Sequence, residues 1–186
     1  MDFPWRAAVV PKEDLRFRFA LEQGFDESCG FAAVASALGL YWGDEVSEGE
    51  LVDALFGDRD EIRSISLADM KRMAESRGFS VVGLCPEWED LQAILDSYAP
   101  VLVHYAKPTG HFALLFSARE GRAVTADPAR GLECLSREQF RARWSGAILV
   151  LASADRNRRV DFALEAVRTA EGRAALAGRL ARENPR

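Results

Sequence analysis

Length, composition and charge narrow the classes of protein to which this chain can belong. Its 186 residues are 48% hydrophobic, which fits one compact domain with a core and excludes a disordered or fibrous chain. The net charge of −5, without any lysine–arginine cluster interleaved with aromatic residues, argues against a nucleic-acid partner.

The first half of the chain is predicted to be mostly helical. Residues 15–21 alternate between apolar and other side chains with period two, which predicts a short strand or extended arm leading to Gln23. Runs of small apolar residues, Ser-led capping boxes and one-sided apolar spacing predict helices. The predicted helices cover about 29–41, Ser47 to Phe56, Ser66 to Gly78 and 86–98, with a strand at 79–84.

The second half is predicted to be mostly antiparallel sheet. Strands are predicted at 101–105, 111–116, 123–126 and 147–151, with a short helix at 136–144. A helical half followed by antiparallel strands is an α+β arrangement. We predict that residues 1–153 form one domain.

Residues 154–186 are predicted to form a charged, helical C-terminal extension. Its larger apolar residues are Val160, Leu164, Val167, Leu176 and Leu180. Their spacing fits an amphipathic helix, which Gly172 and Gly178 are expected to interrupt or weaken. We expect a solvated or partly frayed extension, and the alternatives are that it binds a partner or packs against the core.

The stretch from Gln23 to Gly39 carries the strongest chemical signal. Cys29 is predicted at the first turn of a buried helix, where unpaired backbone N–H groups and the helix dipole favour negative charge. A thiolate is such a charge, so this position suits a nucleophile. Gln23 is a candidate side-chain donor to an oxyanion, together with the N–H groups of that turn. The alternative is that Cys29 is an ordinary buried cysteine.

A nucleophilic cysteine needs a base, and the chain contains two histidines. His111 follows a turn and opens a predicted strand, the kind of junction where active-site groups lie, so it is the candidate base. His104 lies inside an apolar run and is expected to be structural. Asp127 ends the strand predicted to pair with that of His111, so it is the candidate that orients the imidazole. Alternatively, Asp127 and Pro128 only initiate a turn.

The chain has three cysteines, Cys29, Cys85 and Cys134, without the CxxC or Cys/His spacing of a zinc site. We therefore expect no metal and no other cofactor. If Cys29 is a free thiol, Cys85 and Cys134 either pair in an oxidising compartment or both stay reduced in the cytosol. The sequence leaves both alternatives open.

These residues resemble a known family. The matching stretches are Gln23 with Asp26-Glu27-Ser28-Cys29-Gly30, Pro100 to His104 followed by His111-Phe112, Asp127-Pro128-Ala129 with Gly131, and Phe140 with Trp144-Ser145-Gly146. Together, from Leu15 to Leu151, they are similar to the papain-like cysteine peptidases that remove double-glycine leaders from bacteriocins. The resemblance implies Cys29 as nucleophile, His111 as base, Asp127 as orienting residue and Gln23 as oxyanion donor.

The resemblance also implies a papain-like fold and a cysteine endopeptidase that cuts after small, Gly-Gly-like residues in a leader or secretion substrate. A narrow cleft beside Cys29 would need bulky walls, for which Trp42, Tyr105 and Phe112 are candidates unless they belong to the core. The expected partner is a peptide or protein substrate, including a component of a secretion system. The alternatives are a module that binds such a substrate without cutting it, and a related acyl-transfer or amidase activity.

Within this family, we expect the stand-alone form. The exporter-fused form carries membrane and nucleotide-binding regions after the peptidase domain, and this sequence shows no such regions. No apolar stretch approaches the ~20 residues needed to cross a bilayer, so we expect no membrane span. The N-terminus lacks the apolar block of a signal peptide. The compartment stays open: periplasmic if a signal peptide has been removed, and otherwise cytoplasmic.

Overall fold

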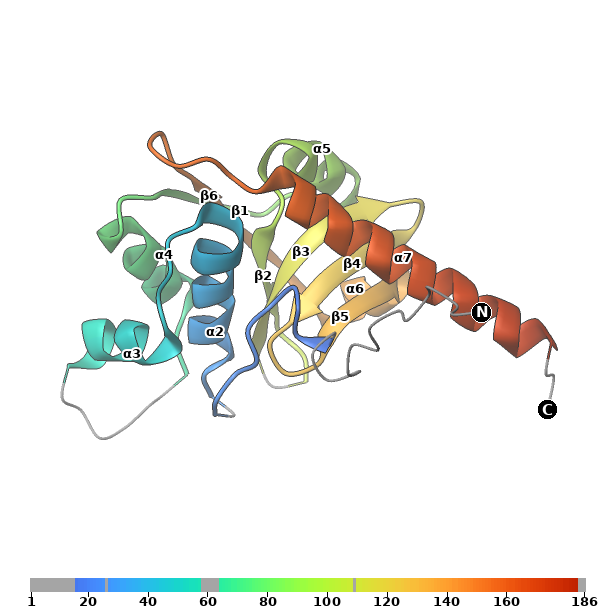
Figure 1. Cartoon of the computed structure of the whole chain (residues 1–186), viewed down its shortest axis with the longest axis horizontal. Coiled ribbons are helices and arrows are strands. Elements are labelled where there is room, and N and C mark those ends of the chain that lie inside the picture. The colour runs from blue at the N-terminus through green and yellow to red at the C-terminus, as the bar shows by residue number, and fades with distance from the viewer. Residues whose placement is uncertain (1–15, 26, 58–63, 109, 184–186) are drawn as a thin grey trace, which may run out of the picture.

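A six-stranded antiparallel sheet forms the centre of the fold, with strand order β1-β6-β2-β3-β4-β5 (Figure 1). The computed structural model describes residues 16–183, apart from residue 26, residues 58–63 and residue 109. The strands are β1 (Ser80–Leu84), β2 (Val101–Tyr105), β3 (His111–Arg119), β4 (Arg122–Asp127), β5 (Gly131–Ser136) and β6 (Trp144–Ala152).

The helices follow the predicted pattern closely. They are α2 (Cys29–Ser36), the π-helical turn η1 (Ala37–Tyr41), α3 (Glu48–Phe56), α4 (Leu67–Ser76), α5 (Trp88–Tyr98), α6 (Arg137–Arg143) and α7 (Val160–Glu183). The capping boxes predicted at Ser47 and Ser66 are confirmed, because each serine accepts a hydrogen bond from the third helical N–H and the side chain at that position bonds back. The predicted α+β class, with helices and an antiparallel sheet, is confirmed.

Helices cover both faces of the sheet, and each face has its own core. On one face, buried residues of α2, η1, α3, α4 and α7 pack against alternate strand residues such as Leu102 and Leu114. On the other face, α5 and α6 pack against the residues between them, such as Val103 and Tyr105. The start of α2 therefore lies against the sheet face to which Leu102 and Leu114 belong.

The segment before α2 is not a strand. Among its described residues, Arg16 is helical, residues 17–20 and 24–25 form bends and turns, and residues 21–23 are irregular. Phe19 is buried whereas Leu21 is exposed. Tyr41 donates its hydroxyl to the Phe19 carbonyl at 2.8 Å, and the Ser36 hydroxyl accepts the Leu21 N–H at 2.8 Å. These side chains of α2 and η1 satisfy backbone groups that a strand would pair with a neighbour. The predicted position of Leu15 lies outside the described residues.

The C-terminal helix α7 is continuous through Gly172 and Gly178, so the predicted interruption is wrong. Figure 1 shows α7 lying across β3, β4 and β5, and its buried residues are Ala163, Ala166 and Ala170. This stripe of alanines lets the helix backbone approach the sheet closely. From Glu171 onward the helix is largely exposed, so the packing alternative describes the first half of α7 and a solvated extension describes the rest.

The two cysteines outside the predicted site lie far apart. Cys85 directly follows β1 at one edge of the sheet, and Cys134 lies in β5 at the other edge. Five strand spacings of about 4.8 Å separate these edges, roughly 24 Å in total, whereas a disulfide requires Cα atoms within about 7 Å. Both thiols are unpaired in the structure, so an intramolecular disulfide between them is excluded in this fold.

Among the described residues, no helix has both the length and the apolar character needed to cross a bilayer.

Candidate active site

Cys29 is the first residue of α2, and the helix start in front of it is not capped by a side chain. Ser28 occupies the N-cap position, but its hydroxyl donates to the Phe25 carbonyl at 2.8 Å and accepts the Phe25 N–H at 3.1 Å. The hydroxyl is thus turned away from the helix. The first-turn N–H groups remain available to a negative charge beside Cys29, and the Cys29 side chain itself is largely buried.

His111 joins Cys29 to Asp127. The His111 Nε2–H donates to Asp127 Oδ1 at 2.8 Å, and the imidazole also forms a hydrogen bond with the Cys29 side chain. His111 opens β3 and Asp127 closes β4, two neighbouring antiparallel strands, so the sheet brings both to the same edge. The structure therefore brings together the three residues that the sequence analysis singled out.

The Asp127 carboxylate is fully buried and held in place by the turn that follows it. Oδ1 accepts the backbone N–H of Ala129 at 2.8 Å and that of Arg130 at 3.2 Å, in addition to His111. The same carboxylate therefore both initiates the turn and accepts the hydrogen bond from His111. Such a fixed acceptor sets the orientation and the tautomer of the imidazole.

Charge and burial shift the pKa values of His111 and Asp127 in opposite directions. Burial lowers the pKa of His111, but its hydrogen bonds to Asp127 and Cys29 outweigh burial and raise the pKa to about 9. Burial raises the pKa of Asp127, but the hydrogen bond and charge of His111 hold that pKa below its ordinary value. At neutral pH the imidazole is therefore a cation between an anionic carboxylate and the Cys29 sulfur.

Gln23 lies next to the Asp127 turn. Its backbone N–H donates to the Pro128 carbonyl at 3.0 Å, which ties the segment before α2 to the end of β4. Its side-chain Nε2 donates to the Phe25 carbonyl at 2.8 Å. In this structure one N–H of the Gln23 amide is thus engaged within its own loop. The amide nitrogen carries a second N–H, and the role of Gln23 as oxyanion donor stays a prediction.

A cavity of about 360 Å³ opens beside Cys29. Its lining residues come from the start of α2, from the segment before α4 and from the β2–β3 hairpin. They are Glu27, Cys29, Gly30, Ser64, Ile65, His104, Gly110, His111 and Phe112. The nucleophile and base candidates therefore share one cleft, and the predicted wall residue Phe112 lines it.

Comparison with known families agrees with this geometry. The model of the Peptidase C39 family matches residues 20–156. This range includes Gln23 and the three hydrogen-bonded residues Cys29, His111 and Asp127. The chain belongs to the Peptidase C39 family.

Two curated relatives illustrate the range of C39 proteins that this chain is similar to. The probable functional amyloid protease FapD of Pseudomonas fluorescens is 34% identical over 146 residues, covering 73% of this chain and 61% of the relative. The colicin V secretion/processing ATP-binding protein CvaB of Escherichia coli is 28% identical over 147 residues, covering 76% of this chain but 19% of the relative. The chain thus spans about three fifths of the FapD length.

Solved C39 domains share the fold. The peptidase domain of Streptococcus ComA, from a bi-functional ABC transporter involved in quorum sensing, superposes with a TM-score of 0.63 at 21% identity, covering 72% of this chain and 97% of that domain. A double-glycine-motif protease from an AMS/PCAT transporter, solved with its leader peptide, gives a TM-score of 0.60 at 22% identity, covering 70% and 88%. These matches confirm the predicted papain-like fold.

Two of the predicted wall residues lie elsewhere in this C39 domain. Trp42 follows η1, about 19 Å along the helix axis from Cys29, and packs edge-on against Phe79 with ring centroids 5.6 Å apart. Tyr105 is buried on the opposite face of the sheet, where it packs against Phe140 and stacks beside His111 at 6.4 Å. Trp42 is therefore core, and Tyr105 supports the imidazole from behind instead of lining the cleft.

The sequence analysis gave no site role to several of the residues that line the cleft, among them Gly30, Ile65 and His104. His104 was expected to be structural, yet it is half-buried and lines the same cavity as Cys29. The signal was the cross-strand register, because His104 pairs with Phe112 and therefore projects from the same sheet face. For Ile65 the sequence carries no comparable signal, since it lies in an irregular segment before α4.

Gly30 is predicted to be essential for the shape of the cleft. A Cβ at this position would lie 2.6 Å from Ile65 Cγ1 and 3.2 Å from Phe112 Cδ2. Gly30→Ala is therefore expected to lower the free energy of unfolding by about 1–2 kcal/mol and to slow cleavage, because Ile65 has to move. The matched control is Gly172→Ala in α7, where no atom lies within 4 Å of the new Cβ, and which is expected to stabilise by about 0.5–1 kcal/mol. Urea denaturation measures both, and equal stability of Gly30→Ala and the wild type would contradict the packing argument.

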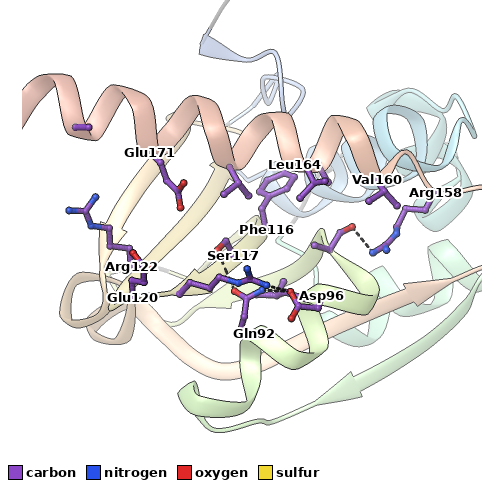
Figure 2. Close-up of a pocket in the computed structure, with 16 residues that line it drawn as sticks. Gln92, Asp96, Phe116, Ser117, Glu120, Arg122, Arg158, Val160, Leu164 and Glu171 are labelled. Carbon is purple, nitrogen blue, oxygen red and sulfur yellow. Dashed lines mark hydrogen bonds and ion pairs between the residues drawn. The ribbon is translucent and has the colours of Figure 1, made fainter.

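A larger cavity, of about 520 Å³, lies away from this site, between α5, α7 and the β3–β4 hairpin (Figure 2). Figure 2 shows Phe116 and Leu164 at its apolar centre and Arg158 at one end, where the guanidinium donates to the Ala99 carbonyl at 2.7 Å. Its lining contains neither cysteine nor histidine. The larger of these two cavities is therefore not the one that holds Cys29 and His111.

Proposed function

We propose that this chain is a cysteine endopeptidase that cleaves a peptide bond after a pair of small, Gly-Gly-like residues in a leader or secretion substrate. The observation that carries the proposal is the hydrogen-bonded series Cys29–His111–Asp127 at the uncapped start of α2, inside a cleft. A nucleophile, a base within reach of it and a third group that orients the base are the arrangement that nucleophilic catalysis requires.

In the first half of the reaction, the Cys29 thiolate attacks the substrate carbonyl carbon and the carbonyl π electrons move to oxygen. The Cys29 backbone N–H and the Gln23 side-chain amide donate to that oxyanion. Protonated His111 gives its proton to the leaving nitrogen as the C–N bond breaks. The products of this half are a free amine and a thioester on Cys29.

In the second half, His111 is neutral and acts as a base. It takes a proton from a water molecule, whose oxygen attacks the thioester carbonyl, and the C–S bond then breaks. The peptide leaves with a new carboxyl group, and Cys29 and His111 return to the thiolate–imidazolium state. Asp127 keeps the imidazole in one orientation through both halves.

The preference for small residues follows from the crowding of the cleft. The Gly30 backbone, Ile65 and Phe112 are packed so closely that one added methyl group on Gly30 collides with both side chains. A substrate residue placed between these walls and Cys29 has little room for a side chain, so Gly and Ala are favoured. The names of FapD and CvaB, a protease and a secretion/processing protein, support a substrate that is destined for secretion.

We expect recognition to depend also on an amphipathic helix that precedes the small-residue pair, with anchors at helical spacing. Two peptides test this: both carry the same Gly-Gly junction, and the second has its apolar helix anchors replaced by serine. The first peptide is expected to be cleaved and the second to be cleaved much more slowly, as followed by mass spectrometry. Equal cleavage of both peptides would show that the helix anchors are not recognised. Binding of the first peptide without cleavage would favour a binding module, and cleavage of neither, with a reactive Cys29, would favour another acyl-transfer substrate.

A further inference from the structure

His104 occupies the catalytic cleft without a structural task of its own. Its ring lies against Phe112, with centroids 5.0 Å apart, and its Nε2 lies 3.8 Å from the position that a Cβ would take on Gly110. Within the described part of the chain, His104 forms no hydrogen bond and no ion pair. A half-buried imidazole whose nitrogens have no partner among the described residues, in the same cavity as Cys29, is placed to meet a ligand.

The two histidines of the cleft differ in charge. Burial lowers the pKa of His104, whereas the pKa of His111 is raised to about 9. At neutral pH His104 is therefore uncharged, with one ring nitrogen that donates a hydrogen bond and one that accepts. A peptide group offers the same complement, an N–H and a carbonyl oxygen.

We propose that His104 is a substrate-binding residue that hydrogen bonds to the main chain of the small-residue pair beside the scissile bond. The inference rests on the proposed peptidase function. Glycine and alanine present almost no side chain for an enzyme to read, so a site that selects them has to bind their peptide groups. In this proposal, Phe112 limits the space for substrate side chains, and His104, from the neighbouring strand, hydrogen bonds to the substrate main chain.

Two substitutions separate hydrogen bonding from packing. His104→Phe keeps an aromatic ring against Phe112 but removes both nitrogens, and His104→Gln keeps a donor and an acceptor without the ring. On the Gly-Gly peptide, His104→Phe is expected to raise KM about three- to tenfold with little change in kcat, because one uniform binding contact is lost. His104→Gln is expected to recover part of that loss. The thermal midpoint and the alkylation rate of Cys29 should stay at wild-type values in both variants.

A coupling measurement decides whether the contact is to the substrate main chain. A series of peptides carries an ester in place of each peptide group, one at a time, over the four residues before the cut. Each ester removes the N–H and also weakens the carbonyl oxygen as an acceptor, so a contact to either group is detected. If His104 binds one of these groups, one ester peptide loses affinity for the wild type and shows no further loss with His104→Phe, so the two effects are not additive.

Each outcome has a distinct meaning. Additive effects for every ester peptide, or an unchanged KM in His104→Phe, would overturn the assignment of His104 while leaving the peptidase proposal intact. A fall in the thermal midpoint that accounts for the whole loss would also overturn it, because it would show a packing role. Failure of the wild type to cleave the parent peptide would instead overturn the proposed function, and the role of His104 with it.

Discussion

Cys29→Ala is expected to abolish cleavage and to leave the fold intact. The sulfur is the group that forms the covalent bond to the substrate, so no slower route through the same intermediate remains. The substitution removes one small side-chain atom at a helix start whose cap is not made by Cys29, so the expected loss of stability is at most about 1 kcal/mol. Cleavage of the Gly-Gly peptide by mass spectrometry and thermal unfolding by circular dichroism check the two parts.

Cys85→Ala and Cys134→Ala are the matched controls for this substitution. Cys85 is exposed beyond β1 and Cys134 lies in β5 at the opposite edge of the sheet, so neither lines the cleft. Both variants should cleave at the wild-type rate. Residual turnover by folded Cys29→Ala, or loss of turnover in either control, would remove Cys29 from the central position in the mechanism.

His111→Ala is expected to reduce kcat by about four orders of magnitude, as in other enzymes that lose a member of a catalytic triad. The imidazole both donates the proton to the leaving nitrogen and forms a hydrogen bond with the Cys29 side chain, so one change removes two effects. Steady-state kinetics on the folded variant measures the loss. A decrease of less than about tenfold would show that another group supplies the proton.

The same pair predicts how stability changes with pH. The folded-state pKa of His111 is about 9, above the ordinary value of 6.5. A raised pKa means that the stabilisation is complete below about pH 6.5, decreases as pH rises, and is lost above about pH 9. We therefore expect the free energy of unfolding to fall over that window in the wild type, and this slope to be smaller in His111→Ala. Urea denaturation at a series of pH values measures it.

The sequence predicted which candidate site residues lie together better than it predicted the residues around them. Cys29, His111 and Asp127 each stand where an element begins or ends, and such junctions are visible as a helix start, a turn and an Asp-Pro pair. The wall residues depend on which side of a buried element faces the cleft. Trp42 and Tyr105 are large and apolar in sequence, but one lies at the far end of the helical segment and the other on the opposite face of the sheet.

Strand β5 is a second element that the pattern of apolar and polar residues does not predict. Residues 131–136 form an edge strand that the sequence analysis did not predict. Its side chains are mixed in polarity and mostly half-buried, so neither face of the strand has a continuous row of apolar residues. The strand exists because Gly131, at φ +80°, turns the chain back along β4, where each residue of β4 finds a partner. Tertiary pairing, and not local preference, decides this segment.

The C-terminal extension is helical as predicted, but its large apolar residues do not mark the face that packs. Val160, Leu164, Leu176 and Leu180 suggested an amphipathic helix, yet all four are exposed in α7. The face that packs consists of the alanine stripe together with the partly buried Phe162 and Val167. Alanines contribute little hydrophobicity in a sequence pattern but allow close approach to the sheet. Where the domain ends relative to residue 153 stays a prediction, and the buried alanines of α7 favour counting the first half of this helix with the peptidase domain.

The central claim is that Cys29 is an activated nucleophile paired with His111, and competitive alkylation tests it most directly. The wild type is treated with limiting iodoacetamide at about pH 6, and labelling of the three cysteines is followed by peptide mapping. The account predicts that Cys29 reacts far faster than Cys85, although Cys29 is only 7% exposed and Cys85 lies on the surface, and that His111→Ala removes this advantage. Faster labelling of Cys85 than of Cys29 in the wild type, as exposure alone would give, would contradict the account.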